Sequence, residues 1–364
     1  MIDKRNLAAL PARLIDRMGL KLPSRYPVRF IIERGNWSIK WDGTYIAGEI
    51  EKKYPGVVRV DERPYLLTNK IVHFGSQYQW TAWQSYLAKS NRMVCTFFHG
   101  VRGDDEALNR HVDAFLASLP RLMRVITAAK MIEDRLLGWG VPRNKLVRIP
   151  IGVDTSLFKP VSKQMREEER AKRGIRPDQF VLGSFQKDGV GWGDGMEPKT
   201  IKGPDILIEV AKKIAKEMPL VVMLTGPARG YVMRELERSK IPYIHEFVDN
   251  YLDLPSRFSV LDAYINPSRE EGGPKGILES MASGVPVVSA KVGMAPDVIT
   301  HGATGMLHDV GDVENMAASV ISLAQSAEFR SSLAENARQN ILDYDWKNVA
   351  LMHYDLVYRP MMEK

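Results

Sequence analysis

The chain has 364 residues, of which 45% are hydrophobic and 26% are charged. These fractions are typical of soluble globular proteins, and they exclude collagen-like sequence, a disulfide scaffold and wholesale disorder. The length suggests about two domains. No apolar run approaches the roughly 18 residues that span a bilayer, and the first residues do not resemble a secretory signal. Together with a single cysteine, Cys95, this predicts a cytoplasmic protein.

Basic residues are concentrated in the first part of the chain. The formal net charge is +7, but residues 1–150 hold 25 basic and 14 acidic residues, a net charge of +11, against −4 for the remainder. This asymmetry favours contact with something anionic: nucleic acid, an anionic membrane or a phosphorylated substrate. It is also consistent with solubility alone.

Residues 4–25 combine basic and apolar side chains in a helical pattern. Leu7, Leu10, Leu14 and Met18 recur at helical spacing, among six basic residues: Lys4, Arg5, Arg13, Arg17, Lys21 and Arg25. Such a segment can lie in the interface of an anionic membrane, with each basic residue contributing about 1 kcal/mol. Alternatively, its leucines pack onto the domain. Pro11 interrupts the pattern and is able to break the helix.

The rest of the first half alternates strands and helices. We expect strands at 28–32, 70–74, 93–98 and 124–127 and helices at 44–53 and 109–118. This alternation is typical of parallel α/β layers, whose ligands bind beyond the carboxyl ends of the strands. Arg34-Gly35-Asn36-Trp37, His73 and His99 follow or end three of these strands, although a lone histidine at a strand end is usually structural.

The second half restarts the pattern. Strands are predicted at 180–185, 220–225, 243–245, 263–266 and 285–289, after an irregular stretch, 149–160, that contains Pro150, Gly152 and Pro160. Two successive α/β units imply two Rossmann-like domains, with the boundary in that stretch.

A lysine loop, residues 186–203, leaves the strand 180–185. Its glycines fit neither the Walker A nor the G-x-G-x-x-G spacing, which disfavours a kinase or a dehydrogenase. Lys187 at the strand exit and Lys202 at the helix entry can neutralise the charge on a departing diphosphate without a metal. The spacing alone favours two solvated lysines.

A glutamate loop, residues 266–276, follows the strand 263–266 and opens into a helix at 277–283. Its glycines let the backbone approach a ligand, and the N–H groups of Gly276, Ile277 and Leu278 are predicted to face an anion. Glu271 in the loop and Glu279 in the first helical turn are expected to accept hydrogen bonds from hydroxyls, as an acidic residue does for ribose in dinucleotide folds. A sugar nucleotide offers both phosphates and hydroxyls. Alternatively, Glu279 complements the helix dipole and the glycines form a turn.

The string from Pro267 to Val288 resembles the E-x7-E region of the retaining GT-B glycosyltransferases, group 1 and family 4 type. Residues 149–160 are similar to that family's interdomain segment, 293–305 to its next strand and turn, and 345–358 to its terminal helix. The resemblance implies an α/β GT-B fold, in which two Rossmann-like domains face a central cleft. The implied parts are an acceptor-side domain at 1–157, a nucleotide-sugar domain at 158–342, and a helix at 343–364 that crosses back to the first domain.

The resemblance also implies roles for single residues. In the family, a Gly-Arg pair and a Lys-Gly pair supply two cations to the diphosphate. Lys202-Gly203 matches the second pair, whereas Ser184 stands where arginine is usual, so Lys187 is the candidate replacement. Glu271, Lys202, Lys187 and His99 are therefore the expected catalytic residues. The expected donor-binding residues are Glu279, Gly273, Pro274, Lys275, Gly276, Ile277, Gly183, Ser184 and Gly226.

The implied function is transfer of a hexose from a UDP- or GDP-sugar, with retention, to a glycan, a glycolipid or another acceptor in surface polysaccharide or glycoconjugate biosynthesis. We expect no cofactor or metal beyond the nucleotide-sugar substrate. The expected location is the cytoplasm or the inner membrane face, with peripheral contact to anionic lipid. Two alternatives remain: a GT-B sugar-nucleotide epimerase, which would need further acid and base groups, and a basic nucleic-acid-binding protein. The positive charge shows no aromatic-interleaved motif, so no nucleic acid is expected.

Overall fold

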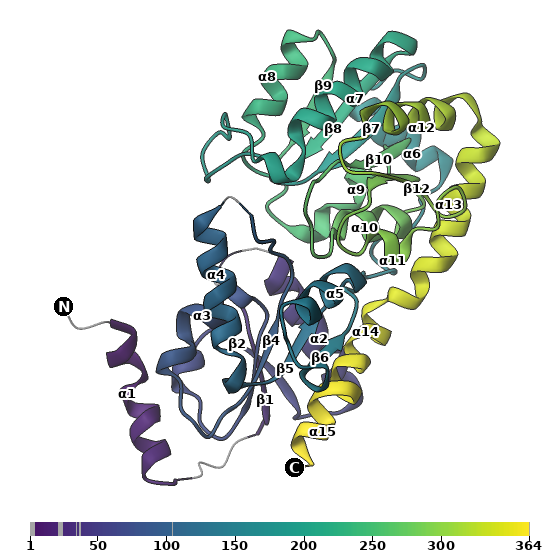
Figure 1. Cartoon of the computed structure of the whole chain (residues 1–364). Coiled ribbons are helices and arrows are strands. Elements are labelled where there is room, and N and C mark those ends of the chain that lie inside the picture. Colours follow the sequence, from purple (N-terminus) through teal and green to yellow (C-terminus); the bar gives the residue numbers. More distant parts are fainter. Residues whose placement is uncertain (1–3, 21–24, 34, 36–37, 104, 364) are drawn as a thin grey trace. The chain divides into compact units, whose positions relative to one another are not determined.

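The computed structural model describes residues 4–20, 25–33, 35, 38–103 and 105–363. The chain divides into two compact units. Unit 1 comprises Met1–Gly152 and Trp346–Lys364, and unit 2 comprises Val153–Asp345. The two crossings between the units therefore fall at Gly152/Val153 and Asp345/Trp346, each a few residues from the expected positions. Figure 1 shows the C-terminal helices of unit 1 in yellow.

Unit 1 contains a parallel sheet in the order β2-β1-β3-β4-β5-β6. Its strands are β1 (Val28–Ile31), β2 (Val58–Asp61), β3 (Ile71–Phe74), β4 (Arg92–Thr96), β5 (Leu122–Thr127) and β6 (Leu146–Arg148). Its helices are α1 (Lys4–Arg17), α2 (Ser38–Lys53), α3 (Gln77–Trp83), α4 (Glu106–Ala117), α5 (Lys130–Gly138), α14 (Trp346–His353) and α15 (Arg359–Met362). The edge strands β2 and β6 were not predicted, because each is short and carries charged residues that weaken the apolar signal.

The C-terminal segment completes unit 1. Helix α14 packs on α2, where the rings of Tyr45 and Trp346 stack with their centroids 5.6 Å apart. A π-helical turn follows at Tyr354–Tyr358. In the interior of the unit, the Tyr358 hydroxyl lies 2.6 Å from Nδ1 of His73, and Nε2 of the same ring lies 2.8 Å from the Thr96 hydroxyl. Burial lowers the pKa of His73 well below its usual value. His73 is thus a neutral structural residue that joins the C-terminal segment to β3 and β4.

Helix α1 forms despite Pro11, but it does not pack as expected. Its buried residues are Ala9 and Ala12, whereas Leu7, Leu10, Leu14 and Met18 are 57%, 44%, 47% and 69% exposed. Of the two alternatives for this segment, the one in which these leucines pack onto the domain is therefore wrong. Among the described residues, no helix has the length and apolar character needed to cross a bilayer.

Unit 2 contains a second parallel sheet, in the order β12-β11-β10-β7-β8-β9. Its strands are β7 (Phe180–Phe185), β8 (Leu220–Thr225), β9 (Tyr243–Glu246), β10 (Ala263–Asn266), β11 (Val287–Ala290) and β12 (Met306–His308). Its α-helices are α6 (Lys163–Lys172), α7 (Pro204–Glu217), α8 (Gly230–Arg238), α9 (Pro255–Phe258), α10 (Lys275–Ala282), α11 (Ala295–Val298), α12 (Val313–Gln325) and α13 (Ala327–Ile341). The core lies between the sheet and helices α7 and α12.

The strand order of unit 2 is that of a doubly wound sheet, in which successive strands are added first on one side of β7 and then on the other. The order reverses between β7 and β10, and ligands of such sheets bind outside the carboxyl ends of the strands at this switch point. One expectation for unit 2 was wrong. Residues 295–298 form helix α11, and the strand predicted in 293–305 starts only at Met306.

Candidate active site at the switch point of unit 2

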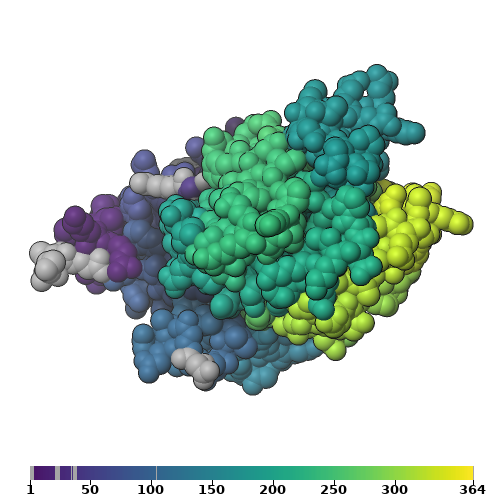
Figure 2. Space-filling view, turned by 90° about the horizontal axis from the view of Figure 1, so that it is seen from above, coloured from purple at the N-terminus to yellow at the C-terminus, as the bar shows by residue number. Residues whose placement is uncertain are grey.

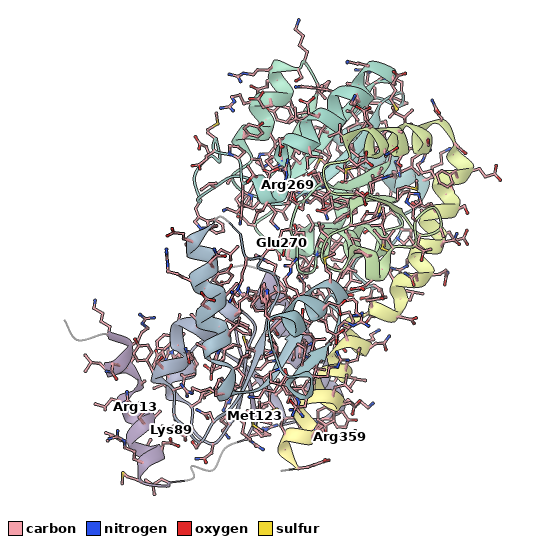
Figure 3. All side chains as sticks on the ribbon, viewed as in Figure 1. Arg13, Lys89, Met123, Arg269, Glu270 and Arg359 are labelled. Carbon is pink, nitrogen blue, oxygen red and sulfur yellow. The ribbon has the colours of Figure 1, made fainter. Side chains whose placement is uncertain are left out.

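The loops that follow β7 and β10 meet at the switch point. After β7 the chain passes through the lysine loop to the short helix η5 (Thr200–Lys202), and after β10 it passes through the glutamate loop to α10. The backbone N–H groups of Arg269 and Glu270 both donate to the carbonyl of Ile201, at 2.8 and 3.2 Å. The Arg269 guanidinium also pairs with both oxygens of Asp205, at 2.8 and 2.6 Å. Figure 3 labels Arg269 and Glu270 in this region.

Glycine is required where the two loops touch. Gly203 has φ +64°, and a Cβ there would lie 2.1 Å from the carbonyl oxygen of Pro267. It precedes Pro204, which begins α7 with the proline preferred at a first helical position. The sequence Lys202-Gly203-Pro204 therefore places a lysine side chain against the glutamate loop.

That lysine forms an ion pair with the first glutamate. Nζ of Lys202 lies 2.6 Å from Oε1 of Glu271, and their side chains are 21% and 10% exposed. The buried hydroxyl of Ser268 donates to the same oxygen at 2.9 Å. The structure thus brings together a cation and a carboxylate that are 69 residues apart in sequence, both still reachable from solvent.

The second glutamate lies on α10. Glu279 is the fifth residue of the helix rather than part of its first turn, and its Oε1 accepts a hydrogen bond from the Tyr251 hydroxyl at 2.7 Å. The ammonium of Lys275 lies 5.3 Å from the centroid of the Tyr251 ring. Tyr251, which the sequence did not single out, is therefore a neighbour of two expected donor-binding residues.

The start of α10 differs in detail from the predicted anion site. The N–H of Ile277 donates to the carbonyl of Pro274 at 3.0 Å, so it is already bonded. A Cβ at Gly276 would lie 2.1 Å from the Tyr264 hydroxyl, so this glycine is needed for packing whether or not a ligand binds. Burial, together with the charges of Glu279 and Glu271, raises the pKa of Tyr264. Gly273, Pro274, Lys275 and Gly276 are all partly exposed.

Three expected donor-binding residues lie in packed surroundings. A Cβ at Gly183 would lie 2.3 Å from Leu261, and Ser184 is fully buried inside β7. Gly226 has φ +94°, a Cβ there would lie 2.7 Å from the carbonyl oxygen of Gln186, and its own carbonyl lies 2.8 Å from Nε2 of His245. The immediate reason for these residue types is therefore the packing of β7 and β8.

Arg229 lies beside Ser184 and was missed by the sequence analysis. Its side chain is 1% exposed, and Nη1 donates to the carbonyls of Ser184, Gln186 and Thr225 at 2.6, 3.0 and 2.9 Å. Its Nε lies 2.9 Å from Oδ1 of Asp188. Burial lowers the pKa of Arg229 and raises that of Asp188. An arginine thus joins the ends of β7 and β8, but from within the fold and 45 residues after Ser184.

The lysine loop contains three lysines, Lys187, Lys199 and Lys202. Lys187 lies 4.4 Å from the centroid of the Trp192 ring, which is 60% exposed. Burial lowers the pKa of Lys199, and the charges of Lys202 and Lys187 lower it further while Glu271 opposes them. The charges of Lys187, Lys202 and Glu271 thus all act on Lys199. Lys199 was not predicted.

Backbone hydrogen bonds fasten the lysine loop at its base and to α8. The N–H of Lys199 donates to the carbonyl of Asp188 at 2.7 Å, which closes the base of the loop. The N–H of Gly230 donates to the carbonyl of Asp194 at 2.7 Å and so fixes the loop to the start of α8. The loop is therefore held to the same end of the sheet as Arg229.

The remaining predicted site residues belong to unit 1. His99 follows β4, is half-buried, and its carbonyl accepts a hydrogen bond from the Gln77 amide at 2.8 Å. Arg34, Asn36 and Trp37, which make up most of the predicted loop after β1, lie outside the described residues. A pocket of about 450 Å³ lies at the carboxyl end of β1, where Glu33 and the stacked rings of Tyr65 and Trp83 line it.

Comparison with known proteins gives a family match within unit 2. Residues 192–326 match the family model described as glycosyl transferases group 1. The chain is 28% identical over 226 residues to a D-inositol 3-phosphate glycosyltransferase of Saccharomonospora viridis, covering 58% of this chain and 49% of that protein. It is 25% identical over 162 residues to an N-acetyl-alpha-D-glucosaminyl L-malate synthase of Bacillus anthracis, covering 44% and 42%. The chain spans about half the length of the curated relatives it matches.

Solved structures extend the likeness to the fold of the whole chain. HepE of Anabaena, in complex with UDP and glucose, matches with a TM-score of 0.72 and 17% identity over 92% of this chain and 99% of its own. Sucrose-phosphate synthase of Thermosynechococcus elongatus matches with a TM-score of 0.74 and 15% identity over 93% and 100%. The two six-stranded parallel sheets are those of the GT-B fold. Residues 192–326, within unit 2, therefore resemble the group 1 glycosyltransferases, and the chain has the GT-B fold.

Proposed function

We propose that this protein transfers a hexose from a nucleoside diphosphate sugar to a glycan or lipid-linked acceptor, with retention at the anomeric carbon. The observation that carries the proposal is the junction of the lysine and glutamate loops at the switch point. It presents the Lys202–Glu271 pair and, on the adjoining helix α10, Glu279 with Tyr251. Cations next to carboxylates suit a ligand that has both phosphates and hydroxyls. HepE, a structural neighbour, was solved with UDP and glucose, so UDP-glucose is the first donor to test.

The proposed chemistry needs charge stabilisation rather than a nucleophilic side chain. The bond between the anomeric carbon and the diphosphate oxygen breaks, and the acceptor oxygen bonds to that carbon on the same face. The departing diphosphate takes the proton of the acceptor hydroxyl. Lys202, and with it Lys187 and Lys199, would neutralise the negative charge that develops on the diphosphate. Glu279 would accept hydrogen bonds from the ribose hydroxyls, and Glu271 would face the sugar.

The first experiment is a panel of nucleotide sugars tested for thermal stabilisation, since a ligand that binds the folded state raises the unfolding temperature. With the donor known, Lys202→Ala should lower kcat by roughly 10²- to 10³-fold, the usual cost of losing one charge-stabilising group. Lys212→Ala is the matched control, because Lys212 also pairs with a glutamate, Glu209 at 2.8 Å, on the outer face of α7. Equal kinetics for the two variants would contradict the proposed role.

The proposal also predicts that no metal is required, because lysines supply the positive charge at the diphosphate that a metal ion would otherwise provide. Turnover should survive EDTA. A loss that magnesium or manganese restores would show that a metal binds the diphosphate instead. Sugar transfer must also depend on an added acceptor. A sugar nucleotide that changes its stereochemistry without an acceptor would assign the site to an epimerase.

A further inference from the structure

Helix α1 has its apolar side on the outside. Its small residues Ala9 and Ala12 face unit 1, and what we call the leucine face is exposed: Leu7, Leu10, Leu14 and Met18. A helix that only had to pack on unit 1 would bury its leucines, because burial stabilises by about 25 cal/mol per Å² of apolar surface. Adjacent exposed apolar side chains of this size mark an interaction surface. Figure 2 shows the purple N-terminal segment, which includes α1, at the left of the view.

The orientation of α1 is fixed near both ends of the helix. Near its start, the guanidinium of Arg5 donates to the carbonyl of Ala82 at 2.8 Å and lies over the ring of Tyr86. Near its end, the carboxylate of Asp16 accepts a hydrogen bond from the N–H of Lys89 at 2.8 Å. Both contacts are on the side of Ala9 and Ala12, so the leucine face cannot turn inward without breaking them.

The charges that α1 itself places beside the leucine face are basic. The helix contains four basic residues and one acidic residue, and the acidic one, Asp16, is turned toward unit 1. At about 100° per residue, Lys4 falls on one side of the leucine face and Arg13 and Arg17 on the other. Arg13 donates to the amide oxygen of Asn6, which does not neutralise its charge.

We propose that the leucine face of α1 binds the surface of an anionic lipid bilayer. The helix lies in the plane of the membrane, with its leucines at the boundary of the acyl chains and its basic side chains among the headgroups. A second copy of this chain is a poorer occupant, because a symmetric contact would bring the basic flanks of two α1 helices together. The net charge of +11 in residues 1–150 attracts the same anionic surface.

The test is co-sedimentation of the full chain with vesicles of phosphatidylglycerol and phosphatidylcholine and, in parallel, of phosphatidylcholine alone. We expect binding to the anionic vesicles at low salt and little to the neutral ones. Raising salt from about 0.1 M to 1 M should weaken binding, since it shortens the screening length from about 10 to 3 Å. Because no nucleotide sugar is present, the result is independent of the proposed enzymatic function.

Two pairs of variants test the face itself. Leu14→Gln should weaken vesicle binding about tenfold, whereas Leu356→Gln should not, although both leucines are 47% exposed. Arg17→Gln should weaken binding about fivefold, and Arg59→Gln, on the exposed side of β2, should have little effect. Leu14 is on the surface already, so its replacement should leave the unfolding temperature unchanged, and a binding defect would not reflect misfolding.

Two results would overturn the proposal. One is equal binding to anionic and neutral vesicles, or none to either, at low salt. The other is a dimer in solution that Leu14→Gln dissociates, with no vesicle binding by the wild type, which would assign the leucine face to a second copy of the chain.

Discussion

Replacing Arg229 with methionine should strongly destabilise unit 2. The change removes three hydrogen bonds to the carbonyls of Ser184, Gln186 and Thr225 and leaves the buried carboxylate of Asp188 without its cation. Removing one partner of a buried ion pair costs about 3–5 kcal/mol. For a unit of this length, each kcal/mol lowers the unfolding temperature by about 2–4 °C, so we expect a fall of roughly 6–20 °C.

Differential scanning calorimetry of the full chain measures this fall. Arg234→Met is the control, because Arg234 lies on α8, which begins directly after Arg229, is 35% exposed, and contacts its neighbour Glu235 and the ring of Tyr231 at the surface rather than a buried partner. Its effect should stay within about 0.5 kcal/mol. Because Arg229 also holds the base of the lysine loop, the Arg229 variant should lose nucleotide affinity at temperatures where it is still folded. If the two variants unfold within about 1 °C of each other, the guanidinium is not the cross-link we describe.

Three further predictions concern single side chains. Burial lowers the pKa of His353 to about 3. The unfolded chain therefore binds a proton that the folded chain does not, so the free energy of unfolding should fall as pH drops below about 6.5. Urea titrations at several pH values should show that this dependence on pH is weaker in His353→Gln than in the wild type. Tyr251→Phe should weaken nucleotide-sugar binding by several-fold in calorimetric titrations, and Glu279→Ala by more, because the tyrosine orients the carboxylate that would hold the ribose. Trp192→Ala should lower kcat more than it changes donor KM in steady-state kinetics if the ring positions Lys187, and Trp192→Phe should restore much of the loss.

The sequence predicted the central strands of both sheets well, because buried parallel strands are continuous apolar runs. It missed β2 and β6, which are short edge strands with charged residues. The residues of the Lys202–Glu271 pair could be named in advance because each stands at a loop that follows a strand. Their direct pairing could not, because it depends on how two loops fold against each other.

Arg229 and α1 show two things that the sequence pattern does not predict: a long-range contact and the side of a helix that faces the protein. Nothing in the spacing between Ser184 and Arg229 signals that an arginine from the start of α8 reaches back to β7. For α1, the leucine periodicity correctly predicted an amphipathic helix. Periodicity states that a helix has an apolar side, but it does not state which side meets the protein, and here alanines do.

The return of the chain from unit 2 to unit 1 has a consequence for synthesis on the ribosome. Unit 2 is one continuous segment, whereas unit 1 needs Trp346–Lys364 to fill its interior around Trp346 and Tyr358. Domains generally fold as units while the chain emerges. Unit 2 can therefore finish folding before unit 1, because residues 1–152 need Trp346–Lys364 to complete their core. A stop codon directly after unit 2 would leave unit 1 without helices α14 and α15. An expression clone of unit 1 should join these two segments through a short linker rather than end at Gly152.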